Sequence, residues 1–150
     1  MSLLTPELLA NIGRRSEPRR EIVTRRDIRK YAVSTDNRQR KYLDGDLAPP
    51  MYHVPLFWDV VELDQLSPDG VSIDTLLPKF PLEKAMAGGL QIEYHKPIRP
   101  GDWLTATRTL TDIYEKAGRS GPLIFYEVIM EVVNDDGELV IREKTTRILR

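Results

Sequence analysis

Apolar and polar residues alternate most regularly in the last third of the chain. From Leu123 to Val133 the even positions are apolar, whereas Glu127 and Glu131 lie on the other face. A two-residue period of this kind predicts a β-strand with one buried face. Trp103 to Lys116 is rich in threonine, and Leu139 to Leu149 has the composition of a returning strand. The residues that we expect in the core of this sheet are Ile124, Tyr126, Val128, Met130 and Val132.

Turn-forming residues separate these strands. The strand predicted from Trp103 to Lys116 is followed by the turn Gly118-Arg119-Ser120-Gly121-Pro122. Asp136-Gly137 is a strong hairpin signal before the strand predicted from Leu139 to Leu149. A further strand is predicted around Leu90, Ile92 and Tyr94, because they alternate with polar residues until Pro97, which has no N–H to donate. The pattern predicts a continuous antiparallel sheet.

The first half of the chain has helical signals instead. Thr5-Pro6-Glu7 predicts a short capped helix, and Thr24 with Asp27 predicts a second helix that ends near Ser34. Residues 35 to 50 are polar or turn-forming and predict a structured loop. After Pro55, an apolar stripe predicts the only strongly apolar helix, which ends near Leu63; its members are Phe57, Val60 and Val61. Residues 64 to 84 contain several prolines and predict an irregular connection.

Several long strands with one apolar helix to bury predict an α+β fold in which the sheet wraps around that helix, the hot-dog arrangement. We expect residues 1–150 to form one such domain, because this length suits a single hydrophobic core. One unit leaves a sheet edge unpaired, so we expect two units side by side as a double hot dog.

The composition excludes several classes of protein. The formal net charge is −1 and no apolar run approaches the length of a membrane span, so neither a nucleic acid nor a membrane is an expected partner. The chain has no cysteine, which excludes disulfides, thiolate nucleophiles and cysteine-based zinc sites. The first residues lack a secretory pattern, and a cytoplasmic protein is expected.

Positive charge is nevertheless concentrated in one segment. Residues 14 to 41 contain eleven Lys and Arg residues against four acids, a difference of about +7. One interpretation is a solvated surface balanced by acids elsewhere in the fold, since long basic side chains usually remain in water. The other is a binding site for phosphate groups. Nucleic acid is the weaker form of the second interpretation, because no aromatic stacking motif accompanies the charge.

Three motifs in order carry a resemblance to a known family. They are Ala48-Pro49-Pro50-Met51-Tyr52-His53, Ala87-Gly88-Gly89 continuing to Glu93-Tyr94-His95-Lys96-Pro97-Ile98-Arg99-Pro100-Gly101-Asp102, and Glu115 to Leu123. From about Ile22 to Arg150 the chain resembles the N-terminal dehydratase half of MaoC-like (R)-specific enoyl-CoA hydratases, most closely that of mesaconyl-CoA (methylfumaryl-CoA) hydratases. The resemblance implies an acyl-CoA thioester as substrate and addition or removal of water across its 2,3 bond. It implies neither a metal nor a redox cofactor.

One loop departs from the family pattern. Active halves carry an Asp and, a few residues later, a His that handle the water and the substrate proton. The corresponding loop here runs from Ser34 to Tyr42; it keeps Asp36, places Tyr42 where the His is expected and contains one inserted residue. A tyrosine with an ordinary pKa near 10 is a poor base at neutral pH, so we expect this chain to be inactive or nearly so by itself.

The remaining catalytic candidate is a histidine. His53 precedes the predicted apolar helix, where it either shares a site with helix N–H groups or only lines the junction. His95 falls on the polar side of its strand, which favours a position at the rim. We therefore take Asp36, Tyr42 and His53 as the candidate catalytic residues.

Other residues suit the CoA part of a thioester. The turn at Lys116, Arg119, Ser120 and Gly121 offers cations, a hydroxyl and close backbone approach to a phosphate or amide, although an ordinary hairpin uses the same residue types. Arg99, at the corner after Pro97, is a further phosphate candidate or a solvated surface residue.

Two classes of function remain open. The chain is either the binding half of a hydratase whose Asp/His half lies on a separate MaoC-like chain, or a non-catalytic acyl-CoA-binding homodimer. A hot-dog thioesterase is a weaker third possibility, because the predicted helix offers no acidic nucleophile or base.

Overall fold

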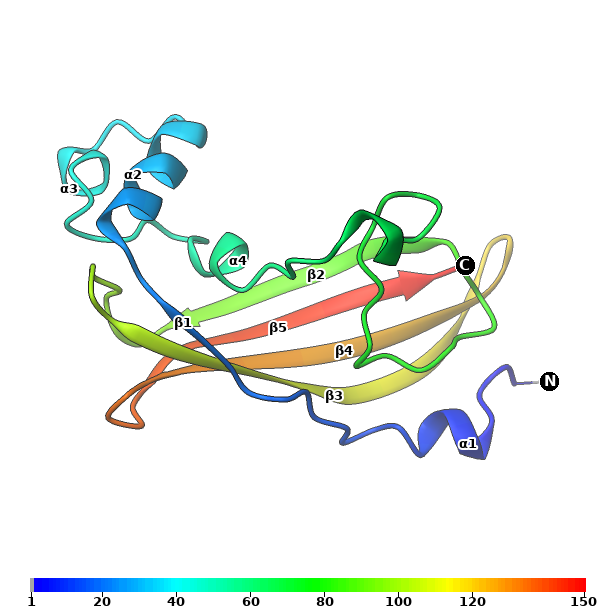
Figure 1. Ribbon diagram of the computed structural model, residues 1–150. Coiled ribbons are helices and arrows are strands. Elements are labelled where there is room, and N and C mark those ends of the chain that lie inside the picture. Colours follow the sequence, from blue (N-terminus) through cyan, green and yellow to red (C-terminus); the bar gives the residue numbers. More distant parts are fainter. Residues whose placement is uncertain (1) are drawn as a thin grey trace.

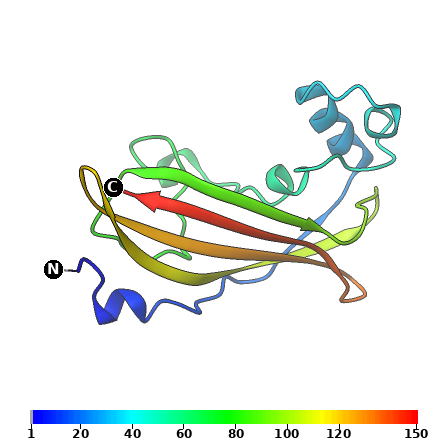
Figure 2. The ribbon, with the colours of Figure 1, turned by 180° about the vertical axis from the view of Figure 1, so that it is seen from behind.

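A computed structural model describes residues 2–150 and consists of one five-stranded antiparallel sheet with short helices around it (Figures 1 and 2). The strands are β1 (Arg19–Ile22), β2 (Ala85–Tyr94), β3 (Trp103–Gly118), β4 (Gly121–Asn134) and β5 (Leu139–Leu149), in the order β1-β3-β4-β5-β2. The predicted hairpins at residues 118–121 and 134–139 join β3 to β4 and β4 to β5. The predicted antiparallel sheet is confirmed.

The helices are short. They are α1 (Pro6–Leu9), α2 (Arg25–Ser34), α3 (Arg40–Leu43), α4 (His53–Leu56) and the 3₁₀ turn η1 (Leu63–Gln65). Thr5 and Thr24 cap α1 and α2 as predicted, each accepting a hydrogen bond from a backbone N–H three residues later. None of the helices described is long and apolar enough to cross a membrane.

The helix predicted after Pro55, ending near Leu63, is wrong: the α-helix found here lies before Phe57, and residues 57–62 are not helical. It begins at His53 and ends at Leu56, so Val60 and Val61 lie beyond it. Of the three side chains that suggested a buried stripe, Val60 is 94% exposed and Val61 36% exposed, whereas Phe57 is partly buried against the core. Apolar spacing cannot distinguish a helix from an irregular segment when the apolar residues are not buried by the sheet.

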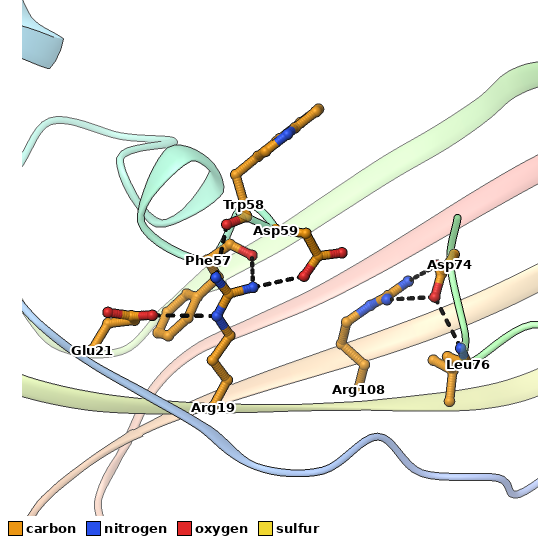
Figure 3. Close-up of polar contacts among 8 residues, drawn as sticks. All are labelled: Arg19, Glu21, Phe57, Trp58, Asp59, Asp74, Leu76 and Arg108. Atoms are coloured by element: carbon orange, nitrogen blue, oxygen red, sulfur yellow. Dashed lines mark hydrogen bonds and ion pairs between the residues drawn. The ribbon is translucent and has the colours of Figure 1, made fainter. Parts of the chain in front are cut away.

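The long connection from α4 to β2 lies over the sheet in place of a full central helix, and two arginines bind it (Figure 3). Arg19 of β1 donates to the backbone carbonyls of Phe57 (3.2 Å) and Trp58 (2.9 Å), and it pairs with Asp59 at 2.7 Å. Arg108 of β3 makes a two-pronged ion pair with Asp74, at 3.0 and 2.7 Å. Polar contacts therefore hold segments of the connection against the sheet.

The core forms two clusters along one face of the sheet, which we call the inner face. The first lies near α2 and includes Ile28, Leu104, Val132 and Ile141. The second lies toward the β3–β4 hairpin and includes Leu110, with α1 and residues 76–82 packed against it. The predicted core positions of β4 are all buried; they are Ile124, Tyr126, Val128, Met130 and Val132.

β2 is an edge strand, because within residues 2–150 it pairs only with β5. Leu90 and Tyr94 are each 50% exposed, so the strand is less buried than its alternation predicted. Gly88 forms a bulge opposite β5, and a Cβ there would lie 2.9 Å from Ile148 Cγ1, which explains why this position has no side chain. The other edge, β1, is only four residues long.

Candidate functional site

A pocket of about 310 Å³ lies between the loop that leads into α4 and the end of β2. Tyr42, His53 and Tyr94 contribute to its lining, with His95 and Lys96 at the strand end. Proline and aliphatic residues complete the wall, which includes Pro49, Pro50, Ile98 and Ile141. A largely apolar pocket with a few converging polar groups is the usual form of a small-molecule site.

His53 is held at the bottom of this pocket by an acidic residue of the sheet. Its Nε2 lies 2.6 Å from Oε2 of Glu143 on β5, and the His53 side chain has no exposed surface. Nδ1 is also buried and has no hydrogen-bond partner among residues 2–150. The imidazole is therefore positioned firmly, with neither ring nitrogen open to solvent.

Glu143 belongs to a row of side chains that crosses the inner face. Arg108 of β3 lies opposite Met130 of β4, Met130 lies opposite Glu143, and Glu143 lies opposite Ile92 of β2. Residues opposite one another in adjacent strands share a face of the sheet. The row places an arginine and a glutamate on the inner face, on either side of Met130.

The environment of Glu143 favours its ionised form. Burial alone would raise the pKa of this carboxyl, but the hydrogen bond and charge of His53 together with the Thr145 hydroxyl hold the pKa below its usual value. Thr145 Oγ1 lies 3.2 Å from Oε1 of Glu143. The carboxylate thus has hydrogen-bond donors for both of its oxygens.

Two tyrosines shape the rest of the pocket. The backbone N–H of Met51 donates to the Tyr94 hydroxyl at 3.0 Å, and Met51 has a positive φ of 70°. This contact ties the loop before α4 to the end of β2. Burial, together with the carboxylate of Asp27, raises the pKa of Tyr52 to about 12, so its hydroxyl stays protonated at physiological pH.

Asp36 and Tyr42, the two catalytic candidates of the loop from Ser34 to Tyr42, lie in different surroundings in the structure. Tyr42 is buried in α3 and lines the pocket with His53. The Asp36 side chain is 81% exposed and pairs with Arg38 at 3.3 Å. Asp36 is not among the residues that line this pocket, so no Asp/His arrangement forms from the loop.

The candidates for CoA binding lie at opposite ends of the sheet. Arg99 follows β2 in the loop beside the pocket, where its backbone N–H donates to Asp102, as expected of a turn. Ser120 and Gly121 lie at the β3–β4 hairpin and line a separate pocket of about 390 Å³ with Lys84 and Arg150. Gly121 and Met130 are nine positions apart in β4, or roughly 30 Å at the rise of a strand.

The neighbouring cations of that hairpin have different surroundings. The Lys116 ammonium lies over the rings of Tyr114 and Phe125, 5.3 and 4.9 Å from their centroids. Arg119 is exposed at the tip of the hairpin. Within residues 2–150, no cluster of three or more His, Cys, Asp or Glu side chains could hold a metal ion.

The sequence interpretation missed Glu143, although its position in β5 carried a signal. Glu143 is an even number of residues from Ile141 and Leu149, both of which are buried. An acidic residue in phase with buried positions of a strand indicates a buried partner, here His53. Arg108 occupies an equivalent position in β3 between Ala106 and Leu110 and was missed for the same reason.

Comparison with known proteins gives a consistent family. The family described as FAS1-like, dehydratase domain region, matches residues 10–143. The Mesaconyl-C(4)-CoA hydratase of Chloroflexus aurantiacus is 31% identical over 103 residues, which cover 63% of this chain and 37% of the hydratase. This chain therefore matches little more than a third of that relative's length.

Solved structures share the fold at low sequence identity. The MaoC-like dehydratase of Rhodospirillum rubrum has a TM-score of 0.63 at 22% identity, covering 97% of this chain and 96% of that one. A chain of the ChsH1–ChsH2 complex of Mycobacterium tuberculosis has a TM-score of 0.69 at 16% identity, covering 95% and 86%. The chain belongs to the FAS1-like dehydratase domain family and is a MaoC-like protein of the hot-dog fold.

Proposed function

We propose that this chain is the binding half of a two-unit hydratase or dehydratase acting on an acyl-CoA thioester. The reaction adds the hydroxyl of water to C3 and a proton to C2 of an enoyl thioester, or removes them from the 3-hydroxyacyl form. In this proposal a second hot-dog chain supplies the Asp and His that handle the water and the proton.

The observation that carries this proposal is the absence of an available imidazole in the pocket described. His53 has both ring nitrogens buried, and its Nε2 is bonded to Glu143. His95, the other histidine, lies at the strand end and its Nε2 is 3.4 Å from Glu93. General acid–base catalysis needs a group that reaches the substrate proton; Nε2 of His53 is taken by Glu143, its unbonded Nδ1 is buried, and His95 lies at the exposed end of its strand.

Tyr42 does not replace the missing base. In this proposal it stands where active halves of the family carry histidine, and a phenol is a poorer general base than an imidazole at neutral pH. Its buried ring can still line an acyl pocket together with Tyr94, Pro49 and Ile98. Binding is therefore the role that this chain's own residues support.

The edge of the sheet supports a second unit. Among residues 2–150, β2 pairs only with β5, and Leu90 of this strand is half exposed. Unpaired strand edges with apolar side chains favour pairing with another chain. Beyond α4, further apolar residues are exposed that a partner could cover; they include Trp58, Val60, Leu63 and Ile73. The ChsH1–ChsH2 relative is itself a complex of two chains.

Reconstitution tests the proposal. The chain is co-purified with a MaoC-like chain that carries both the Asp and the His of the loop, and hydration of several enoyl-CoA thioesters is followed by loss of their conjugated absorbance. We expect turnover by the mixture to exceed that of the partner alone, and replacement of the partner's loop histidine by alanine to abolish it. A mixture no more active than the partner alone would contradict the proposal.

A further inference from the structure

A second and larger hollow lies on the other side of α3. Its volume is about 770 Å³, and it is formed between α2 and α3. Figures 1 and 2 show these two helices side by side, beyond the end of the sheet at which β2 stops. We call this hollow the α2–α3 groove; it is lined by Arg25, Arg26, Arg29, Lys30, Val33, Ser34, Arg40 and Leu43.

The groove gathers most of its positive charge from one face of α2. Arg25, Arg26, Arg29 and Lys30 recur at helical spacing, so they project from the same side of the helix. Arg40 adds a fifth cation from α3, and no acidic residue is among the lining side chains. The basic segment detected in the sequence therefore converges on a concave surface.

Contacts with backbone carbonyls fix two of these arginines. Arg25 donates to the carbonyl of Asp44 at 2.7 Å, and Nε of Arg29 donates to the carbonyl of Leu43 at 3.2 Å. Arg25 also pairs with Asp46, and Arg40 pairs with Asp44. A guanidinium has five N–H donors, so Arg29 keeps donors for a ligand after this one bond.

Within residues 2–150, three cations of the groove have little or no acidic neutralisation, namely Arg26, Arg29 and Lys30, and of these Arg29 is held by a backbone carbonyl. The nearest acid to Arg26 is Asp27, at 3.9 Å, and both side chains are largely exposed. Lys30 forms no ion pair with any residue from 2 to 150 under the same 4 Å limit. Several cations that converge on a hollow attract phosphate groups, which arginine binds with paired hydrogen bonds.

α3 connects the groove to the pocket. Arg40 and Leu43 face the groove, whereas Tyr42 of the same four-residue helix lines the pocket with His53. A helix of this length is about 6 Å long. One extended ligand can therefore pass α3 with an anionic end in the groove and an acyl end in the pocket.

We infer that the α2–α3 groove binds the phosphorylated nucleotide end of a CoA thioester. This inference rests on the proposed function, because it takes the thioester as the ligand of the pocket. The phosphates would meet the arginines and Lys30, while Val33, which is 70% exposed, and Leu43 offer an apolar surface to the adenine. The volume of the hollow, about 770 Å³, is in the range of small-molecule sites, which favours a nucleotide over the broad acidic face of a carrier protein.

The test uses adenosine 3′,5′-bisphosphate as the probe, measured by titration calorimetry on the purified chain. The Arg26→Ala/Lys30→Ala variant removes the two least constrained cations, and Arg14→Ala removes an exposed arginine of the same basic segment that does not line the groove. We expect the double variant to bind at least tenfold more weakly, with a difference that shrinks in high salt, and Arg14→Ala to match the wild type.

Three results would overturn the inference: no binding of the probe by the folded wild type, equal affinity in the wild type and the double variant, or the same loss in Arg14→Ala. Binding of an acidic acyl carrier protein through Arg26 and Lys30, without binding of the probe, would also overturn it. The titration requires neither a partner chain nor turnover. If the hydratase assay failed, the result of the titration would still stand, so the two experiments can contradict the two proposals independently.

Discussion

Nε2 of His53 and Oε2 of Glu143 lie 2.6 Å apart across the interior of the domain, joining the short helix α4 to strand β5. Ninety residues separate the two in sequence. In this arrangement the imidazole is fully buried and the carboxylate is nearly so. The pair therefore fixes the first turn of α4 on the sheet and positions His53, which lines the pocket.

Removing the carboxylate should destabilise the domain. In Glu143→Ala, His53 remains buried without a partner for Nε2, and an unsatisfied buried polar group costs about 1–3 kcal/mol. Glu143→Gln keeps an acceptor oxygen and should cost less. Urea unfolding of the two variants measures the difference.

Glu131→Ala is the matched control for that experiment. Glu131 is an exposed glutamate of β4 on the outer face, and its replacement should change stability by less than about 0.5 kcal/mol. If Glu143→Ala were as stable as Glu131→Ala, the pair would have no structural role.

The same contact predicts a dependence of stability on pH. The pKa of Glu143 is lowered in the folded chain, so the folded state binds this proton less readily than the unfolded state. Glu143 therefore contributes its full stabilisation above the pKa of the unfolded state, near 4.5. This stabilisation is lost as the pH falls through the lower pKa of the folded state. Between pH 7 and pH 3, the free energy of unfolding should fall more steeply for the wild type than for Glu143→Gln. If it fell in parallel for both, Glu143 would make no such contribution.

The two arginines of Figure 3 should control the mobility of the connection between α4 and β2. Arg19→Ala removes the donors to Phe57 and Trp58, and Arg108→Ala removes the partner of Asp74. Each variant loses interactions worth about 1 kcal/mol, so the equilibrium constant for local opening of the connection should rise roughly fivefold. Hydrogen exchange of peptides from residues 57–77 should accelerate accordingly.

Arg20→Ala provides the comparison for these variants. Arg20 pairs with Asp135 at the surface, and its loss should leave exchange in residues 57–77 unchanged. Equal acceleration in all three variants would show a general loss of stability rather than release of the connection.

The open edge of β2 predicts association with another hot-dog chain. We expect the purified chain to sediment as a dimer at micromolar concentration, and Leu90→Arg to shift it toward monomer, because a charge would be buried at the new contact. Arg142→Ala, a change on the neighbouring strand β5, should not alter the sedimentation. A monodisperse wild-type monomer, with no association to a MaoC-like partner, would contradict the expectation.

Much of the fold could be predicted because local patterns and burial agree. In β4 the two-residue period coincides with the buried face, and in α2 the Thr24 cap marks the helix start. The hairpins follow from their turn residues. In each case the information lies within a few neighbouring residues.

The pocket could be predicted only in part, because its geometry depends on pairing between distant segments. His53 and Tyr42 were candidates, and both line the pocket. The phase of Glu143 in β5 indicates that it is buried, but its partner His53 lies 90 residues away and no local pattern identifies it. The predicted helix ending at Leu63 failed for a related reason, since Val60 finds no surface to pack against and remains exposed.

Hydration of crotonyl-CoA by the isolated chain tests the central claim most directly. Because both ring nitrogens of His53 are buried and we expect Tyr42 to stand at the position of the family's loop histidine, we predict no turnover above the uncatalysed rate by the chain alone, at a concentration at which it is folded. Addition of a MaoC-like chain with the complete Asp/His loop should raise turnover above that of the partner alone. Robust turnover by the isolated wild type, abolished in a folded His53→Ala variant, would contradict the account and place catalysis at His53.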